Sequence, residues 1–215
     1  MIGKIKNISF ESLLILNTFA LIVTSYLFNN FIFLGVFTLF FFVSLFATKN
    51  GLEIIRKLNL LQNIRTEGPS NHYKKSDTPT MGGIFLIIPF LIFLLIITIN
   101  LGSLKLFLLL LTIFGFFITG FLDDYLSIRN KKNTGLKTKE KFILQSIISI
   151  IFILLAYEKN LINPLITISD SWGINMNIFI LPISFLVLVG ISNSVNLTDG
   201  LDGLAAGCSG IVFYG

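Results

Sequence analysis

Long apolar runs alternate with short polar segments along nearly the whole chain. Each run approaches the roughly 20 residues that a helix needs to cross the hydrocarbon core of a bilayer. The runs expected to span a membrane are Phe10–Phe28, Phe31–Thr48, Met81–Asn100, Leu104–Leu122, Phe142–Tyr157 and Ile178–Val195, and a further run begins at Gly203. The pattern predicts an all-α polytopic membrane protein, a single transmembrane domain containing a bundle of about six to seven helices.

The first run sets an N-terminal extra span, residues 1–30, apart from the remainder, residues 31–215. Lys4 and Lys6 precede this run, as basic residues precede a signal peptide. The run is longer than a signal core, however, and no small-residue cleavage site follows it, so we expect an uncleaved helix. The other end of the chain stops inside an apolar run without a helix stop signal, and we therefore expect a truncated protein.

Positive charge is concentrated in the polar segments between the runs. The chain has 215 residues, is 54% hydrophobic with a mean hydropathy of +0.87, and carries a net charge of +5. Lys49–Pro79 and Ser127–Lys141 each hold six of the 16 lysines and arginines. This distribution follows the positive-inside rule rather than the pattern of a nucleic-acid surface, so the N-terminus and both basic segments are expected to be cytoplasmic. Glu158–Asn177, with a candidate strand at Leu165–Ile168, is expected to face outward.

One polar segment, Ser192–Cys208, carries acids between two apolar runs. If this segment is helical, Asn196, Asp199 and Asp202 recur every three residues and share a face. Acids are costly beside a membrane helix, so they indicate a functional site. The alternative is an ordinary helix start with Asp199 as its N-cap.

A second acidic feature is the adjacent pair Asp123 and Asp124, which directly follows the run Leu104–Leu122. At the C-terminal end of a helix two acids oppose the helix dipole, and a divalent metal or nearby lysines must offset them. Carboxylates together with phosphate oxygens and water form the usual Mg²⁺ environment. The alternative is a pair of solvated acids at the membrane surface.

Two basic features suit phosphate binding. Lys74 and Lys75 lie beside the turn Thr78–Thr80, whose hydroxyl and N–H groups suit an anion, although contact with anionic lipid heads is the alternative. The lysines after the acid pair form either a second phosphate-binding group or a solvated face: Lys131, Lys132, Lys137, Lys139 and Lys141. Acids and lysines together favour metal-assisted phosphoryl chemistry on a substrate partly in lipid. The competing class is a membrane transporter with an acid-lined pathway, whose acids would lie near the bilayer midplane.

Four motifs occur in a fixed order, namely TPTMGG at Thr78–Gly83, GFLDDYL at Gly120–Leu126, GLKTKEK at Gly135–Lys141 and NSVNLTDGLDGLA at Asn193–Ala205. Through them the chain resembles, from about Phe31 to its end, the phospho-N-acetylmuramoyl-pentapeptide transferases. These form the bacterial branch of the polyprenyl-phosphate sugar-1-phosphate transferases. The TPTMGG wording favours this branch over the sibling UDP-GlcNAc:polyprenyl-phosphate GlcNAc-1-phosphate transferases, which remain the alternative.

The resemblance implies a multi-pass enzyme of the bacterial inner membrane with a cytoplasmic active site, acting in peptidoglycan biosynthesis. Such enzymes transfer phospho-MurNAc-pentapeptide from UDP-MurNAc-pentapeptide to undecaprenyl phosphate with Mg²⁺, forming lipid I and UMP. By position, Asp123, Asp124 and Asp199 match catalytic residues, and Asp123 is expected to activate the lipid phosphate. The matched substrate-binding residues are Lys75, Thr80, Asn196, Asp202, Lys131 and Lys139.

The resemblance also carries expectations about the metal. Asp123 and Asp124 are expected to contact Mg²⁺, while the family's main metal ligand is expected beyond residue 215, so this chain alone is expected to be inactive. A homodimer is left open. The family's DDxxK pattern has lysine where this chain has Ser127, and Lys131 is the candidate substitute.

The predicted chemistry requires the acidic segments to converge. Carboxylates must surround a single pyrophosphate, so the acid pair and Asp199 are expected to line one cytoplasmic cleft with Lys131 or Lys139 at its rim. The fourth and sixth runs should then be neighbours, with Gly120 and Gly190 permitting close approach.

Overall fold

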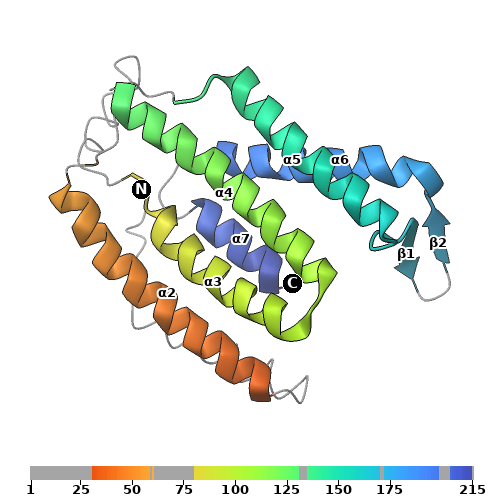
Figure 1. Cartoon of the computed structure of the whole chain (residues 1–215), viewed down its shortest axis with the longest axis horizontal. Coiled ribbons are helices and arrows are strands. Elements are labelled where there is room, and N and C mark those ends of the chain that lie inside the picture. Colours follow the sequence, from red (N-terminus) through yellow and green to blue (C-terminus); the bar gives the residue numbers. More distant parts are fainter. Residues whose placement is uncertain are drawn as a thin grey trace, which may run out of the picture.

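The computed structural model describes residues 31–58, 60, 80–130, 135–169, 172–198 and 204–214. Helices dominate these ranges, and one short hairpin interrupts them (Figure 1). In chain order the elements are α2 (Phe31–Lys57), α3 (Gly83–Leu101), α4 (Leu104–Asn130), α5 (Thr138–Glu158), β1 (Leu165–Ser169), β2 (Trp172–Asn175), the 3-10 turn η2 (Asn177–Phe179), α6 (Ile180–Thr198) and α7 (Leu204–Tyr214).

Within the described ranges, five helices are long and apolar enough to cross a membrane. They are α2 to α6, and they confirm the all-α, multi-span class that the apolar runs predict. The expected extra span at Phe10–Phe28 lies outside the described residues. The run expected after Gly203 contains α7, which has 11 residues.

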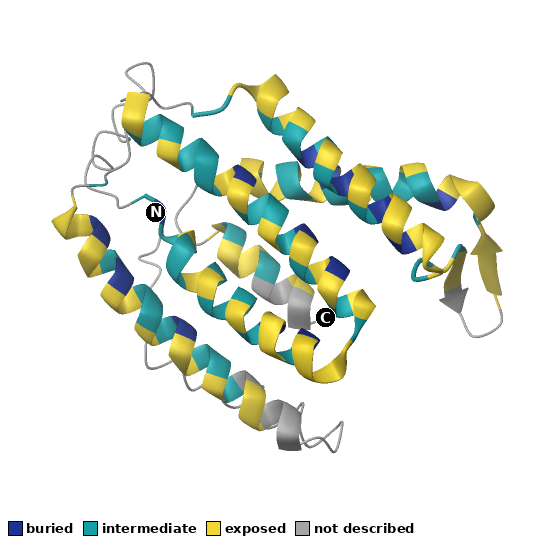
Figure 2. Ribbon diagram, in the orientation of Figure 1, coloured by how far each residue is buried: buried dark blue, intermediate teal, exposed yellow. Residues whose placement is uncertain are grey.

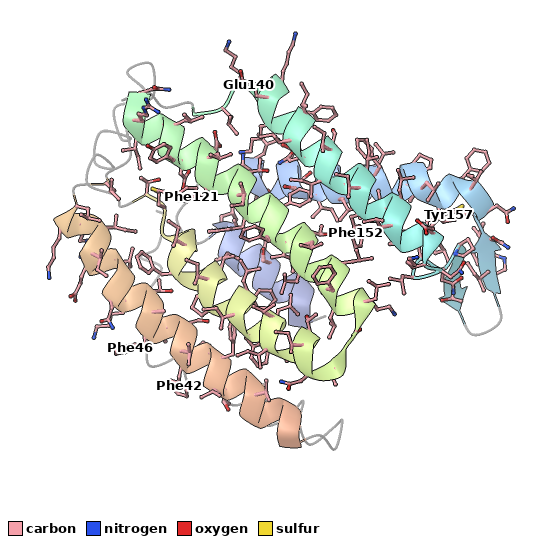
Figure 3. The ribbon with its side chains drawn as sticks, viewed as in Figure 1. Phe42, Phe46, Phe121, Glu140, Phe152 and Tyr157 are labelled. Atoms are coloured by element: carbon pink, nitrogen blue, oxygen red, sulfur yellow. The ribbon has the colours of Figure 1, made fainter. Side chains whose placement is uncertain are left out.

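Consecutive helices pack side by side, so that α3 lies against α2 and α4, and α5 lies against α4 and α6 (Figure 1). Only a few residues of each helix from α2 to α6 are buried, and the others are intermediate or exposed (Figure 2). Many of the exposed side chains are large and apolar. Phe42 and Phe46 are 54% and 68% exposed and lie on the side of α2 away from α3 (Figure 3). Such a surface suits contact with lipid, where apolar side chains carry no cost of hydration.

The buried stripe of α5 contains polar and small residues. Its members are Gln145, Ser149, Ile153 and Ala156, whose spacing places them on one helix face. On the α4 side, Gly115 packs so closely against Ile148 that a Cβ at this glycine would lie 3.0 Å from it. Small residues at such positions let membrane helices approach each other, which fixes α5 between its neighbours.

Buried threonines satisfy their own hydroxyls within their helices. Thr98, Thr112 and Thr119 each donate to the carbonyl oxygen four residues earlier, at 2.7, 2.8 and 3.0 Å. A hydroxyl without a partner is expensive in an apolar environment. These hydroxyls therefore do not need partners on other helices.

The predicted strand at Leu165–Ile168 is confirmed as part of β1, which pairs antiparallel with β2. This hairpin joins the end of α5 to the start of α6, at the opposite end of α5 from the connection between α4 and α5 (Figure 1). All of β2 is exposed, and Trp172 is 58% exposed.

Two expectations about helix geometry are wrong. The helix that begins at Leu104 does not end at Leu122 but continues to Asn130, about two turns past Asp123. The dipole argument for the acid pair therefore fails, because that effect is confined to the last turn. In addition, α4 and α6 do not pack along each other in the described part of the chain, and each packs against α5 instead.

Candidate active site

An open pocket of about 310 Å³ lies where α3 and α5 begin and where α4 and α6 approach their C-terminal ends. Its lining residues are Met81, Gly83, Ile84, Ile87, Phe117, Gly120, Phe121, Asp123, Asp124, Lys141 and Asn196. One part of the lining is aliphatic and aromatic, and another is charged or carries an amide. Such a lining suits a ligand with both an apolar and an anionic part.

Asp123 is held by two elements that follow it in the chain. One carboxylate oxygen lies 2.9 Å from the Lys141 ammonium, and the other accepts a hydrogen bond of 2.9 Å from the backbone N–H of Leu136. The Lys141 and Asp123 side chains are 18% and 26% exposed. A partly buried pair is less screened by water and salt than one at the open surface, so this contact fixes α5 to α4 beside the pocket.

The segment before α5 passes unusually close to α4. A Cβ at Gly135 would overlap the backbone carbonyl oxygen of Asp123, so only glycine fits here without a shift. The next residues begin α5, where the Lys137 N–H donates to the Glu140 carboxylate at 2.9 Å. Figure 3 shows Glu140 at this start of α5, outside the pocket lining.

Asp124 connects α4 to the start of α3. Its carboxylate is half-buried beside Asp123 and accepts a hydrogen bond from the backbone N–H of Met81. Met81 is 9% exposed and has a φ of 64°, a left-handed conformation that costs a non-glycine residue about 1–3 kcal/mol. Strained backbone of this kind is common where a loop is shaped for function, which supports assigning the turn before α3 to the site.

The pocket brings together three of the residues that the sequence predicted for the site. Asp123 and Asp124 come from α4, and Asn196 comes from the last turns of α6. Thr80 directly precedes Met81 of the pocket, and its backbone N–H donates to the Leu60 carbonyl oxygen at 3.1 Å.

The remaining predicted site residues are not placed in the pocket. Lys139 lies exposed in the first turn of α5, and Lys141, two residues later, is the lysine that lines the pocket. In the sequence Lys141 is one of several lysines in a basic run, and nothing singles it out except that it ends the GLKTKEK motif. The others lie outside the described residues and stay predictions: Lys75, Lys131, Asp199 and Asp202.

The acid pair could contribute to a metal site but does not complete one. Among the described residues, no three histidine, cysteine, aspartate or glutamate side chains lie close enough together to hold a metal ion by themselves. Magnesium is often bound by one or two protein carboxylates together with substrate phosphates and water, so Asp123 and Asp124 fit this ion. Each Asp123 oxygen already accepts a hydrogen bond, which makes Asp124 the carboxylate with more unused acceptor capacity.

Two family patterns match this chain. The model described as glycosyl transferase family 4 matches residues 106–215. The pattern described as phospho-N-acetylmuramoyl-pentapeptide-transferase signature 1 matches residues 75–87. The signature contains Met81, Gly83, Ile84 and Ile87 of the pocket, and the other lining residues fall within the family match, so both matched segments meet at one place.

Curated relatives with the same description as the signature match all or most of this chain. A phospho-N-acetylmuramoyl-pentapeptide-transferase of Prochlorococcus marinus (strain MIT 9215) is 88% identical over 215 residues, which are all of this chain and 60% of the relative. The protein of the same description from P. marinus subsp. pastoris is 58% identical over the same shares. That of Halalkalibacterium halodurans is 41% identical over 75% of this chain and 50% of the relative. The chain thus spans about 60% of the length of the first of these relatives.

Proposed function

This chain belongs to glycosyl transferase family 4, and from that membership we propose that the full-length protein makes lipid I. In this reaction an oxygen of undecaprenyl phosphate attacks the β-phosphorus of UDP-MurNAc-pentapeptide. The new pyrophosphate bond forms as the bond to UMP breaks. The names of the relatives, phospho-N-acetylmuramoyl-pentapeptide-transferases, favour this donor over UDP-GlcNAc.

The observation that carries the proposal is the composition of the pocket. Carboxylates, an ammonium and an amide from three helices surround one opening, and an apolar wall adjoins them. Phosphoryl transfer depends mainly on positioning and on stabilising charge, which these groups can supply. The apolar wall suits the first carbons of a lipid chain. A transporter would instead carry its acids near the bilayer midplane, whereas these lie near helix ends.

The proposed roles of the pocket residues come from the family resemblance, and their contacts are compatible with these roles. Asp123 is proposed to activate the lipid phosphate by accepting its remaining proton. In doing so it must exchange one of its hydrogen bonds, to Lys141 or to the Leu136 N–H, for the phosphate. Lys141 then balances negative charge on the phosphates. Asn196 is proposed to bind the nucleotide side, with Asp199 and Asp202 completing that wall.

Magnesium is the proposed cofactor. Asp124, with Asp123, would contribute protein oxygens to it, and the substrate phosphates would contribute others. When bound, the ion neutralises phosphate charge and orients the pyrophosphate. The residues of this chain hold the phosphates next to the apolar wall.

The pocket is proposed to face the cytoplasm of a bacterial inner membrane. The basic segments adjoin the pocket end of the helices, and the hairpin of β1 and β2 lies at the other end. Single cysteines at Lys137 and Asp170, placed in a Cys208→Ser background, test this orientation. A membrane-impermeant thiol reagent added to intact cells should label the cysteine at 170 but not the one at 137. The opposite result would reverse the orientation.

The transfer reaction is tested with purified full-length protein in detergent. UMP release should require undecaprenyl phosphate, UDP-MurNAc-pentapeptide and Mg²⁺ together. UDP-GlcNAc serves as the competing donor. Turnover with UDP-GlcNAc alone would replace the proposed reaction with that of the sibling family, and no turnover with either donor would refute both.

A further inference from the structure

Gln145 forms a polar contact between two membrane helices outside the pocket lining. It is 3% exposed on α5. Its side-chain oxygen accepts a hydrogen bond of 2.7 Å from the Asn193 amide, and its NH₂ group lies 3.3 Å from the Ser192 hydroxyl. Asn193 also donates to the Val189 carbonyl oxygen at 2.8 Å, which fixes the amide on α6. The contact therefore sets how α6 is rotated relative to α5.

Hydrogen bonds between membrane helices often serve only packing. Their average contribution to stability is small, and an apolar pair could fill the same space. Burying an amide between two helices costs free energy, so it is favoured over an apolar contact only where the directionality of its hydrogen bonds is needed. Unlike an apolar contact, the Gln145–Asn193 pair forms in only one relative orientation of the two helices.

The position of Gln145 relates this contact to the pocket. Lys141 lies one turn earlier on the same face of α5 and binds Asp123 of α4. On α6, Asn196 follows Asn193 by one turn and lines the pocket. One face of α5 thus holds both walls of the site, the acids through an ion pair and the amide wall through Gln145.

We infer that Gln145 is a positioning residue for the transferase site, an inference that rests on the proposed function. Through Asn193 it sets the rotation of α6, and thereby holds Asn196 across the pocket from the carboxylates of α4. It does not touch the substrate. Displacement of a contact group by about 1 Å can lower a rate on the order of 100-fold. A less firmly held α6 should therefore have a measurable effect on the kinetics of transfer. The effect should fall on the nucleotide substrate, because Asn196 is on that side of the pocket.

The test uses the full-length protein and separate titrations of its two substrates. Gln145→Leu removes both hydrogen bonds while keeping a similar volume. Gln145→Asn keeps the amide but shortens it by one methylene, and it covers the case in which the leucine variant does not fold. Ser149→Ala is the matched control: Ser149 is fully buried on the same face of α5, and its hydroxyl has no hydrogen-bond partner in the described part of the chain.

We expect Gln145→Leu to raise the KM for UDP-MurNAc-pentapeptide about tenfold, and Gln145→Asn to raise it less. The KM for undecaprenyl phosphate should stay within about twofold. Ser149→Ala should leave both values unchanged. An unchanged KM for UDP-MurNAc-pentapeptide in both Gln145 variants would overturn the inference. Equal increases in the KM values of both substrates, together with a lowered Tm, would also overturn it, because they indicate a purely structural role. A wild-type protein without turnover would overturn the proposed function and this inference with it.

Discussion

Helix α5 holds its two neighbours, α4 and α6, by different chemistry. Toward α4, Lys141 and Asp123 form an ion pair at the pocket, where both side chains keep some exposure. Toward α6, one turn farther from the pocket, Gln145 and Asn193 form a neutral pair, and Gln145 is almost fully buried. The charged side chains keep contact with water, because a buried charge costs far more than a buried amide. The comparison separates groups that bind charge from groups that set geometry.

The largest effect is expected from removing charge at the pocket. Asp123→Asn, Asp124→Asn and Asp199→Asn should each lower kcat of the full-length protein by about 100- to 1,000-fold, because a group that stabilises the transition state is lost. Membrane insertion should not change, since an amide nearly matches a carboxylate in shape. The measurement is UMP release by equal amounts of inserted protein. Any variant that keeps most of its activity would remove that residue from the catalytic set.

A smaller loss is expected from breaking the ionic side of α5. Hydrogen bonds to charged groups contribute about 1.5–3 kcal/mol, so Lys141→Ala should lower kcat/KM by roughly 10- to 100-fold. Lys159→Ala is the matched control, because Lys159 is exposed and, among the residues that the structure describes, forms an ion pair only with its neighbour Glu158 at 3.2 Å. If both variants behaved alike in the transfer assay, the Asp123 contact would have no functional weight.

A substitution in the loop before α5 tests how closely this loop must pack against α4 beside Asp123. Gly135→Ala places a methyl group against the Asp123 carbonyl, and overpacking of this kind destabilises proteins by about 1–3 kcal/mol. We expect a lower Tm in detergent and a loss of activity smaller than that of Lys141→Ala. Gly190→Ala is the control, because open space surrounds that glycine. Equal Tm values would show that the loop moves away without cost.

The smallest effect is expected at the position where the chain departs from the DDxxK pattern. Ser127 lies one turn after Asp123 on α4, so a lysine there reaches a carboxylate at helical spacing, a contact of about 0.2–0.5 kcal/mol. Ser127→Lys should therefore change kcat by less than about threefold. A folded variant without activity would mean that the pocket differs from the resembled pattern more than its lining suggests.

The sequence predicts the helices well because each depends on local composition. The apolar runs identify α2 to α6, and the β-branched residues of Leu165–Ile168 identify β1. The sequence does not predict the C-terminal end of α4, because the polar residues after Leu122 are typical of a loop. In the structure Asp123 and Asp124 stay helical while their carboxylates bind Lys141, Leu136 and Met81.

The site was predictable in its residue types but not in its pairings. Adjacent acids at a membrane helix are costly wherever they fold, so Asp123 and Asp124 are visible from the sequence alone. The choice between Lys139 and Lys141 depends on which face of α5 turns toward α4, and both are plain lysines in a basic run. Gln145 was missed because a single amide in an apolar run has no pattern. Its partner is distant in sequence and is found only by packing.

The length of α4 determines the depth at which the proposed chemistry occurs. Its 27 residues extend about 40 Å, longer than the roughly 30 Å thickness of a hydrocarbon core. Measured from Leu104, Asp124 lies about 30 Å along the helix, which is about the thickness of the hydrocarbon core. At this depth the proposed polyprenyl substrate would present its phosphate to the carboxylates while its tail stays in hydrocarbon. Lifting the tail into water would cost about 0.8 kcal/mol for each exposed methylene. The length of α4 thus allows the carboxylates to meet the proposed lipid phosphate without moving the lipid out of the membrane.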